Sequence, residues 1–285
     1  MRKTITDPGA LLDALALLFP DSSKTTLRQM LQSGRVRVNG EVEKNARRAL
    51  ERGDAIDLAQ KTALVTLPPE LAILHEDDAV IVVLKANGLL TVATERERAT
   101  TAQAYLNVYL KEKGEDRIHV VHRLDRETSG VLVFAKTFEA REALKEKFAE
   151  HDVDRVYVAI IEGEMDPPNG TIRSHLRERK DLRMESVDAH PDAKLAVTHY
   201  RTIETSGRLS MLEIRLETGR KNQIRTHLAE AGHPVAGDRM YGSTINPLGR
   251  LGLHAKLLGF DHPVSGKRMV FTAPLPKAFR FAGSI

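Results

Sequence analysis

The 285-residue sequence contains no cysteine. This absence excludes disulfides, thiolate metal ligands and a cysteine nucleophile, and it fits a reducing, cytoplasmic setting. No apolar run approaches the ~20 residues that a membrane-spanning helix needs, so we expect no membrane association. The first twenty residues include Asp7 and Asp13 and lack a small-residue cleavage pattern, which argues against a signal peptide.

Several common catalytic patterns are also missing. The sequence has no glycine-rich phosphate loop and no Gly-x-Ser-x-Gly turn for a nucleophilic serine. Its eleven histidines lack the spacing of metal ligands, since His227 and His233 lie at opposite ends of one expected helix. We therefore expect no metal ion.

The charge is unevenly distributed along the chain. The formal net charge is +4, and residues 21–50 account for all of it. Seven cations lie in this window against three acids: Lys24, Arg28, Arg35, Arg37, Lys44, Arg47 and Arg48 against Asp21, Glu41 and Glu43. Such a basic patch favours a polyanionic partner. A solvated basic surface without a ligand is the alternative interpretation.

The N-terminal region has the pattern of two helices followed by a hairpin. Five leucines between Leu11 and Leu18 predict a buried first helix, and a second would be capped by Ser22 or Ser23 and end at Gly34.

Arg35-Val36-Arg37-Val38 then alternates, and Asn39-Gly40 is a strong signal for a hairpin turn. A strand over 54–58 completes a small α/β domain of residues 1–60, which a linker over 61–71 follows.

Residues 72–285 mix strand and helix patterns. Apolar runs over 79–84 and 131–135 predict buried strands, and the alternation over 155–161 predicts another. A helix over 223–231 would end at Gly232. The expected fold class is α+β.

One charged cluster lies between apolar runs: His122-Arg123-Leu124-Asp125-Arg126-Glu127-Thr128-Ser129-Gly130. Loops next to core strands commonly hold active-site groups. An ion-paired turn would explain the same charges, and the charge content alone favours neither interpretation.

The sequence around this cluster resembles the RluA family of pseudouridine synthases, whose hallmark is His-Arg-Leu-Asp followed by Thr-Ser-Gly. Other segments match the family in order and spacing: Arg155 to Ala159, Leu216 to Arg220, Gln223 to Leu228, Gly232 to Pro234, Gly237-Asp238, Tyr241-Gly242, Leu253 to Ala255, His262-Pro263 and Phe271 to Pro276. Two positions depart from the family pattern. Lys85-Ala86-Asn87-Gly88 stands where Lys-Pro-x-Gly is usual, and Asn222 stands where histidine is usual.

The resemblance implies an isomerase that converts uridine in RNA to pseudouridine, with a mixed, largely antiparallel sheet and flanking helices. It implies Asp125 as the catalytic carboxylate, which attacks the anomeric carbon or carbon 6 of the base, or abstracts a ribose proton. Arg225 is implied as its ionic partner. Tyr157 is implied as the ring that stacks on a flipped base and helps to remove the carbon-5 proton. Because the reaction involves no redox change and no net hydrolysis, we expect no cofactor.

Five further residues are expected to bind substrate. Ile224 is implied to lie near the base, and the others to hold phosphates: Arg123, Arg126, Arg220 and Lys221. Another basic stretch over 173–183 either grips RNA or forms a mobile, solvated loop.

The N-terminal segment resembles the small RNA-binding domain named after the fourth small-subunit ribosomal protein, through Leu27 to Leu31, Gly34 to Gly40 and Gly53-Asp54. This resemblance implies phosphate contacts from the seven cations and RNA as the partner. We expect ribosomal RNA rather than tRNA, no DNA, and a monomeric protein.

Two other functions compete with this interpretation. A non-catalytic RNA-binding or ribosome-assembly protein could keep a synthase-like fold. A nucleoside-cleaving glycosidase would need two carboxylates, and Glu127 and Asp238 are the nearest candidates for the second.

Overall fold

The computed structural model of the protein describes residues 2–20, 22–32, 34–58, 67–95, 97–188 and 190–280. The chain divides into two compact units, Met1–Val65 and Thr66–Ile285. Residues 59–66, which include much of the expected linker, lie outside the described residues. The first strand of the second unit begins at Leu71, inside the range expected for the linker.

The first unit combines two helices with short strands. Its elements are β1 (Arg2–Thr4), β2 (Gly9–Ala10), α1 (Leu11–Leu18), α2 (Lys24–Gln32), β3 (Val36–Val38), β4 (Glu41–Val42), β5 (Ala49–Leu50) and β6 (Ala55–Leu58). An antiparallel sheet has the order β1-β6-β3-β4, and β2 pairs with β5.

Local signals in the sequence set the ends of these elements. Ser23 caps α2, because its Oγ accepts a hydrogen bond from the Thr26 N–H at 3.1 Å. Asn39 and Gly40 both have positive φ, 54° and 89°, as a two-residue hairpin turn of the primed type requires. The expectation that all the leucines of α1 are buried was wrong for Leu17, which is 85% exposed. Only Leu11 and Leu15 are fully buried, because they share the inward face of this two-turn helix.

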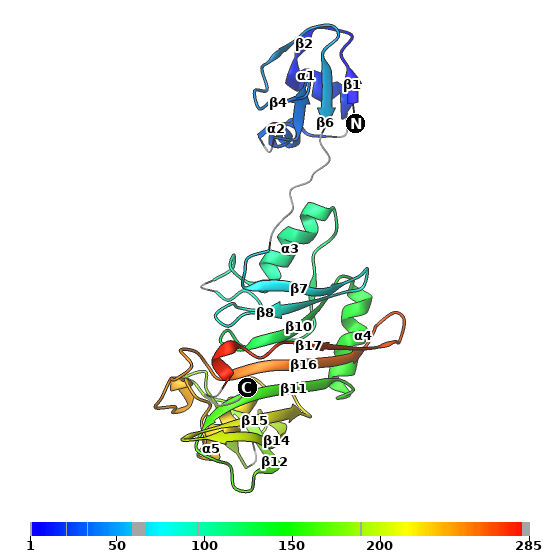
Figure 1. The fold of residues 1–285 in the computed structure, drawn as a ribbon. Helices are drawn as coiled ribbons and strands as arrows, with labels where there is room; N and C mark the ends of the chain where they lie inside the picture. Colours follow the sequence, from blue (N-terminus) through cyan, green and yellow to red (C-terminus); the bar gives the residue numbers. More distant parts are fainter. Residues whose placement is uncertain are drawn as a thin grey trace. The chain divides into compact units, whose positions relative to one another are not determined.

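The second unit is built on one large sheet (Figure 1). Its strands are β7 (Leu71–Glu76), β8 (Val80–Lys85), β9 (His119–Val120), β10 (Ser129–Ala135), β11 (Asp154–Glu162), β12 (Asn169–Glu178), β13 (Met184–Val187), β14 (Lys194–Ser206), β15 (Leu209–Leu216), β16 (Leu253–Asp261) and β17 (Arg268–Thr272). The order is β13-β12-β14-β15-β11-β16-β10-β8-β7, with β17 beside β16 and β9 beside β10. Every pairing in the described sheet is antiparallel except that of β10 with β16.

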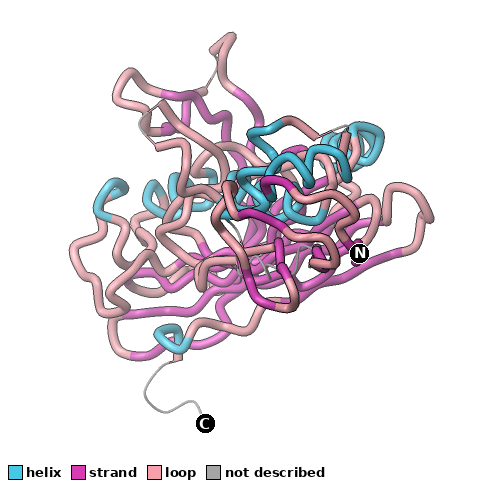
Figure 2. Tube along the Cα trace, turned by 90° about the horizontal axis from the view of Figure 1, so that it is seen from above, coloured by secondary structure: helices cyan, strands magenta, loops and turns pink. Residues whose placement is uncertain are grey.

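Helices pack on both faces of this sheet, and strands outweigh helices in the view of Figure 2. The helices are α3 (Ala102–Lys113), α4 (Phe138–Ala149) and α5 (Gln223–Glu230), with short 3₁₀ turns η1 (Arg239–Tyr241) and η2 (Lys277–Phe279). Buried residues of α3 and α5 belong to the same apolar cluster as Ile81 and Val83, on one face of the sheet, and those of α4 to the cluster of Val80 and Val82 on the other. Burial on both faces explains why β8 and β10 are continuous apolar runs in the sequence. The expected α+β fold is confirmed.

Two irregularities in the sheet position the charged cluster. Gly130 has φ 124°, and a Cβ there would lie 2.1 Å from the Ala255 carbonyl oxygen, so only glycine lets β10 approach β16 this closely. The register of β11 against β16 shifts between Val156 and Tyr157. Such bulges change the direction of neighbouring side chains.

Candidate active site

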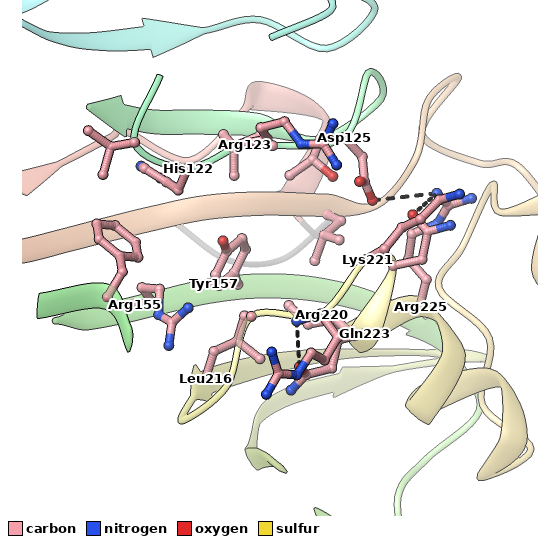
Figure 3. A pocket seen from close by; sticks show the side chains of 18 of the residues that line it. His122, Arg123, Asp125, Arg155, Tyr157, Leu216, Arg220, Lys221, Gln223 and Arg225 are labelled. Atoms are coloured by element: carbon pink, nitrogen blue, oxygen red, sulfur yellow. Dashed lines mark hydrogen bonds and ion pairs between the residues drawn. The ribbon is translucent and has the colours of Figure 1, made fainter. Parts of the chain in front are cut away.

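A pocket of about 770 Å³ lies beside the charged cluster. Its walls come from the 120–128 loop, the C-terminal end of α4, β11, and the segment from Leu216 into α5. Figure 3 shows Asp125 and Arg225 on one side of Tyr157 and Arg155 on the other. The pocket brings together side chains about 100 residues apart in the sequence.

Asp125 is the only acidic residue among the described residues that line this pocket. Its side chain is 34% exposed, so a substrate can reach the carboxylate. Arg225 Nη1 lies 3.5 Å from Asp125 Oδ2. The ionic partnership that the resemblance implied is therefore present in the geometry.

Arg225 binds a second carboxylate more closely. Its Nε and Nη2 donate to the two oxygens of Asp238, at 2.6 and 2.8 Å, and the Asp238 side chain is only 2% exposed. Burial opposes the charge on Arg225, but the hydrogen bonds and charge of Asp238, helped by Asp125, raise the pKa of the guanidinium. Arg225 therefore carries a fixed positive charge beside Asp125.

Asn222, one of the two departures from the family pattern, also contacts Arg225. Its Oδ1 accepts from Arg225 Nη1 at 3.1 Å, and its Nδ2 donates to the Tyr241 hydroxyl at 3.1 Å. Asn222 precedes α5 with φ 50°, a left-handed conformation that asparagine tolerates better than most residues. The Tyr241 ring lies under the guanidinium, 4.9 Å from ring centroid to Cζ. These contacts fix the orientation of Arg225.

Buried groups hold the loop that carries Asp125. Thr91 Oγ1 donates to the Leu124 carbonyl at 2.8 Å and accepts from the Leu124 N–H at 3.2 Å. The fully buried Lys85 donates to three carbonyl oxygens, of Ala86, Leu89 and Arg126. Burial lowers the pKa of Lys85 to about 7, although the charge of Asp125 opposes the shift.

The other departure from the family pattern lies next to Lys85. The Ala86 N–H donates to the Glu70 carbonyl at 2.8 Å, a hydrogen bond that the usual proline could not make. The departure therefore preserves the turn at the end of β8.

His122 anchors the start of the same loop. Its Nε2 accepts a hydrogen bond from the Val133 N–H at 3.3 Å, and its ring stacks on Phe148 at 4.6 Å. Burial, and then the charge of Arg155, lowers the pKa of His122 to about 3. The histidine is thus neutral at pH 7.

Tyr157 lies in the wall of the pocket, on β11. Its side chain is nearly buried, at 9% exposure, and the residue directly follows the register shift described above. Burial raises the pKa of its hydroxyl to about 12, so Tyr157 is a neutral phenol at pH 7.

The residues expected to bind substrate divide into two groups. Arg123, Arg220, Lys221 and Ile224 line the pocket. Arg126 does not, because its guanidinium turns away to Glu97 at 2.5 Å. Lys221 also pairs with Glu178 at 2.5 Å, and Arg220 Nε donates to the Leu195 carbonyl.

The second acids considered for a glycosidase lie outside the pocket lining. Asp238 is occupied by Arg225, and Glu127 is exposed on the surface of its loop. The described residues therefore offer no carboxylate opposite Asp125 across the pocket.

The cations of the first unit differ in exposure. Lys24, Arg28, Arg37, Lys44 and Arg47 are exposed. Arg35 and Arg48 are half-buried, and Arg48 donates to Glu43 at 2.8 Å. Five of the seven predicted RNA-binding cations are thus fully open to a polyanion.

The basic stretch over 173–183 lies on the end of β12 and on the exposed turn that joins β12 to β13. Strands β12 and β13 pair from His175 to Val187, and Arg177 contacts Glu185 at 2.5 Å. The Tyr241 hydroxyl accepts from the Met184 N–H at 2.9 Å, which connects this hairpin to the residues around Arg225.

The part of the chain that the structure describes contains neither a candidate metal site nor a candidate membrane-spanning helix. No group of three or more potential ligands that could hold a metal ion occurs in the described ranges. Within the same ranges, no helix has the length and apolar character needed to cross a membrane.

The antiparallel sheet with its pocket belongs to the class of RNA-modifying isomerases, as comparison with known proteins shows. The family model described as RNA pseudouridylate synthase matches residues 79–230, and an S4 domain model matches residues 11–56. The chain belongs to the RNA pseudouridylate synthase family, and it is an RNA pseudouridine synthase with an N-terminal RNA-binding domain.

Relatives agree over nearly the whole chain. The ribosomal large subunit pseudouridine synthase D of Salmonella typhimurium is 33% identical, over 94% of this chain and 88% of the relative. An uncharacterized RNA pseudouridine synthase of Bacillus subtilis, YlyB, is 36% identical over 92% and 89%. The solved structure of human RNA pseudouridylate synthase domain containing 4 has a TM-score of 0.62 and 26% identity, covering 73% of this chain and 90% of that one.

Several residues of this site were not expected from the sequence. Asp238 was considered only as a second acid, and neither Lys85 nor Asn222 was assigned a role. Lys85 had a usable signal, because a lysine that ends an apolar run must find partners when it is buried. The contact of Asp238 with Arg225 had none, since it depends on how η1 folds back against α5.

Proposed function

We propose that the protein converts uridine to pseudouridine in large-subunit ribosomal RNA, with Asp125 as the catalytic carboxylate. The observation that carries this assignment is that Asp125 is the only acid lining the pocket in the described residues, with Arg225 3.5 Å away. The names of the relatives support the choice of ribosomal RNA.

The reaction needs few chemical groups. The bond from the anomeric carbon to N1 of the base breaks, and a bond to carbon 5 forms. Carbon 5 loses a proton and N1 gains one, so atoms and electrons balance without a co-reactant. A carboxylate held beside a guanidinium supplies the nucleophile or base that these steps need.

We assign Tyr157 to stacking on the displaced base. The phenol is neutral at pH 7, since its pKa is about 12, so it is a poor general base. Ile224 packs in the same wall at 4% exposure and supplies apolar contact. A base that leaves its stack regains about 1–3 kcal/mol on an aromatic ring.

The decisive experiment uses large-subunit ribosomal RNA transcribed with a tritium label at carbon 5 of uridine. The wild type should release label while the RNA chain stays intact, and both Asp125→Asn and Asp125→Ala should release none. Glu127→Gln is the matched control, because Glu127 lies on the same loop but outside the pocket. Label release by Asp125→Ala would refute the assignment.

We propose further that the first unit supplies phosphate contacts. The test changes Lys24, Arg28 and Arg37 to glutamine in the full chain. RNA affinity should then depend less steeply on salt: the magnitude of the slope of log affinity against log salt should fall by about 2, at ~0.7 for each phosphate that is no longer neutralised. The rate at saturating RNA should not change. The control changes three exposed lysines outside the pocket, Lys111, Lys267 and Lys277. Equal slopes for the two triple variants would contradict the proposal.

We also propose that the protein acts as a cytoplasmic monomer and does not modify DNA. Light scattering of the purified chain should give the mass of one copy, near 31.7 kDa. A deoxyuridine version of the modified RNA segment should release no label.

A further inference from the structure

A buried arginine lies at the end of the pocket away from Asp125. Arg155 belongs to β11 and lines the pocket two residues before Tyr157. Side chains two apart on a strand point to the same face, about 7 Å from each other. Figure 3 shows the Arg155 guanidinium beyond Tyr157, seen from Asp125 and Arg225.

The charge on Arg155 has little compensation from the protein. The residue is 8% exposed, and its one hydrogen bond in the described structure runs from Nη2 to the Glu217 carbonyl at 2.8 Å. Its Nε is buried without a hydrogen-bond partner. No carboxylate among the described residues lies within 4 Å of the guanidinium, whereas Arg225 has two. A buried charge without a counterion is costly, and burial accordingly lowers the pKa of Arg155.

The surroundings of Arg155 hold the guanidinium in place but do not neutralise it. The Phe148 ring lies 5.6 Å from Cζ, and the neighbouring His122 is uncharged. Gly219 leaves space for Nη1, since a Cβ there would lie 2.5 Å from it. Lys145 and Arg220 also line the pocket, and Asp125 is the one acid that does so in the described residues.

We propose that Arg155 forms a second subsite of the pocket, which binds the phosphodiester joining the target uridine to its neighbour. A guanidinium binds phosphate through two parallel hydrogen bonds. A base stacked on Tyr157 places its own backbone one nucleotide step from Arg155. The anion supplies the counterion that the protein lacks. This inference rests on the proposed function of the pocket.

The first test compares Arg155→Met with Arg155→Lys, using unmodified large-subunit ribosomal RNA transcribed in vitro. Arg155→Met should weaken binding roughly 10- to 100-fold and lower the slope of log affinity against log salt by ~0.7 to 0.9. Arg155→Lys should keep the slope of the wild type. The control is Arg141→Met, which removes another arginine–phenylalanine contact of α4, 4.5 Å from Phe138, outside the pocket. An unchanged slope in Arg155→Met would show a purely structural role and overturn the proposal.

The second test changes the RNA instead of the protein. Each phosphodiester near the modified uridine is replaced in turn by an uncharged methylphosphonate, in a short RNA that the wild type modifies. One replacement should weaken binding to the wild type but not to Arg155→Met. If Arg155→Met does not fold, the uncharged Arg155→Gln is compared with the wild type, and equal penalties in these two proteins at every position would overturn the proposal. Release of the carbon-5 label by the wild type tests the proposed pseudouridine synthase function separately. A negative result for the Arg155 subsite would therefore leave the test of that function unaffected.

Discussion

Replacing Asp238 by asparagine removes the negative charge that holds Arg225 and keeps the shape of the side chain. Asparagine fits the same space, but only one of its two terminal atoms can accept a hydrogen bond. Arg225 Nε and Nη2 now donate to both Asp238 oxygens. The variant therefore loses one of these bonds and all of the charge attraction.

The structure sets the expected size of the effect. Removing one partner of a buried ion pair costs about 3–5 kcal/mol, and the remaining acceptor places Asp238→Asn near the lower end. The second unit, residues 66–285, is in the size range where 1 kcal/mol changes Tm by about 2–4 °C. We therefore expect Tm to fall by about 6–12 °C.

Activity should fall as well, measured at a temperature where the variant is folded. Without Asp238, the guanidinium moves toward Asp125, now 3.5 Å away, and a tighter ion pair makes that carboxylate less reactive. We expect the single-turnover rate of label release to fall at least about tenfold, which corresponds to ~1.4 kcal/mol.

Thermal unfolding followed by circular dichroism and single-turnover label release measure the two effects. Asp192→Asn is the control, because the Asp192 side chain is 84% exposed and should change stability by less than about 0.5 kcal/mol. Adding Asp238→Asn to Arg225→Met should cost little more stability, since the interaction is already gone. An Asp238→Asn protein with the Tm and rate of the wild type would refute the reasoning.

Three further predictions concern other groups of the site. Tyr157→Phe keeps the ring and should keep most of the activity, whereas Tyr157→Leu should weaken RNA binding by about 1–3 kcal/mol, measured by filter binding. An equal loss of RNA binding in both variants would assign the role of Tyr157 to its hydroxyl. Asn222→Gly keeps the backbone conformation but loses both side-chain hydrogen bonds, so label release should slow while Tm changes little; an unchanged rate would show that Arg225 needs no support from Asn222. Burial lowers the pKa values of His122, His227 and His254 to about 3, 4 and 4, below the 6.5 of the unfolded chain. The unfolded state therefore binds more protons below pH 6.5, and the free energy of unfolding should fall as the pH drops, by up to ~1.4 kcal/mol per pH unit for each histidine. In urea unfolding, His122→Phe should make this fall with pH less steep. An unchanged pH dependence of the free energy of unfolding would contradict the lowered pKa of His122.

Local structure was largely predictable because its causes are local. Thr137 caps α4, because its Oγ1 accepts a hydrogen bond from the Ala140 N–H at 3.1 Å, a role that threonine commonly fills before a helix. Gly232 has φ 86° just beyond α5, as expected of a glycine that ends a helix. These positions depend on one side chain and a few neighbouring backbone groups.

The site was less predictable because it depends on contacts between distant segments. Arg126 is adjacent to Asp125 in the sequence, yet it turns away to Glu97, while Arg225 approaches from 100 residues further along. Family resemblance, not spacing, suggested Arg225. The burial of Arg155 also had no sequence signal, since a strand arginine next to a tyrosine is usually solvated.

The unequal distances around Arg225 suggest why two carboxylates share one guanidinium. Asp238 binds at 2.6 and 2.8 Å and fixes the position of the cation, while Asp125 lies at 3.5 Å. A carboxylate held by two direct hydrogen bonds would be charged but restrained, and moving it to the substrate would cost those bonds. At the longer distance the guanidinium still attracts the Asp125 carboxylate, because the attraction decreases only slowly with distance in a partly buried site. We infer that Asp238 orients the arginine so that Asp125 keeps a cationic partner and is still free to reach the substrate.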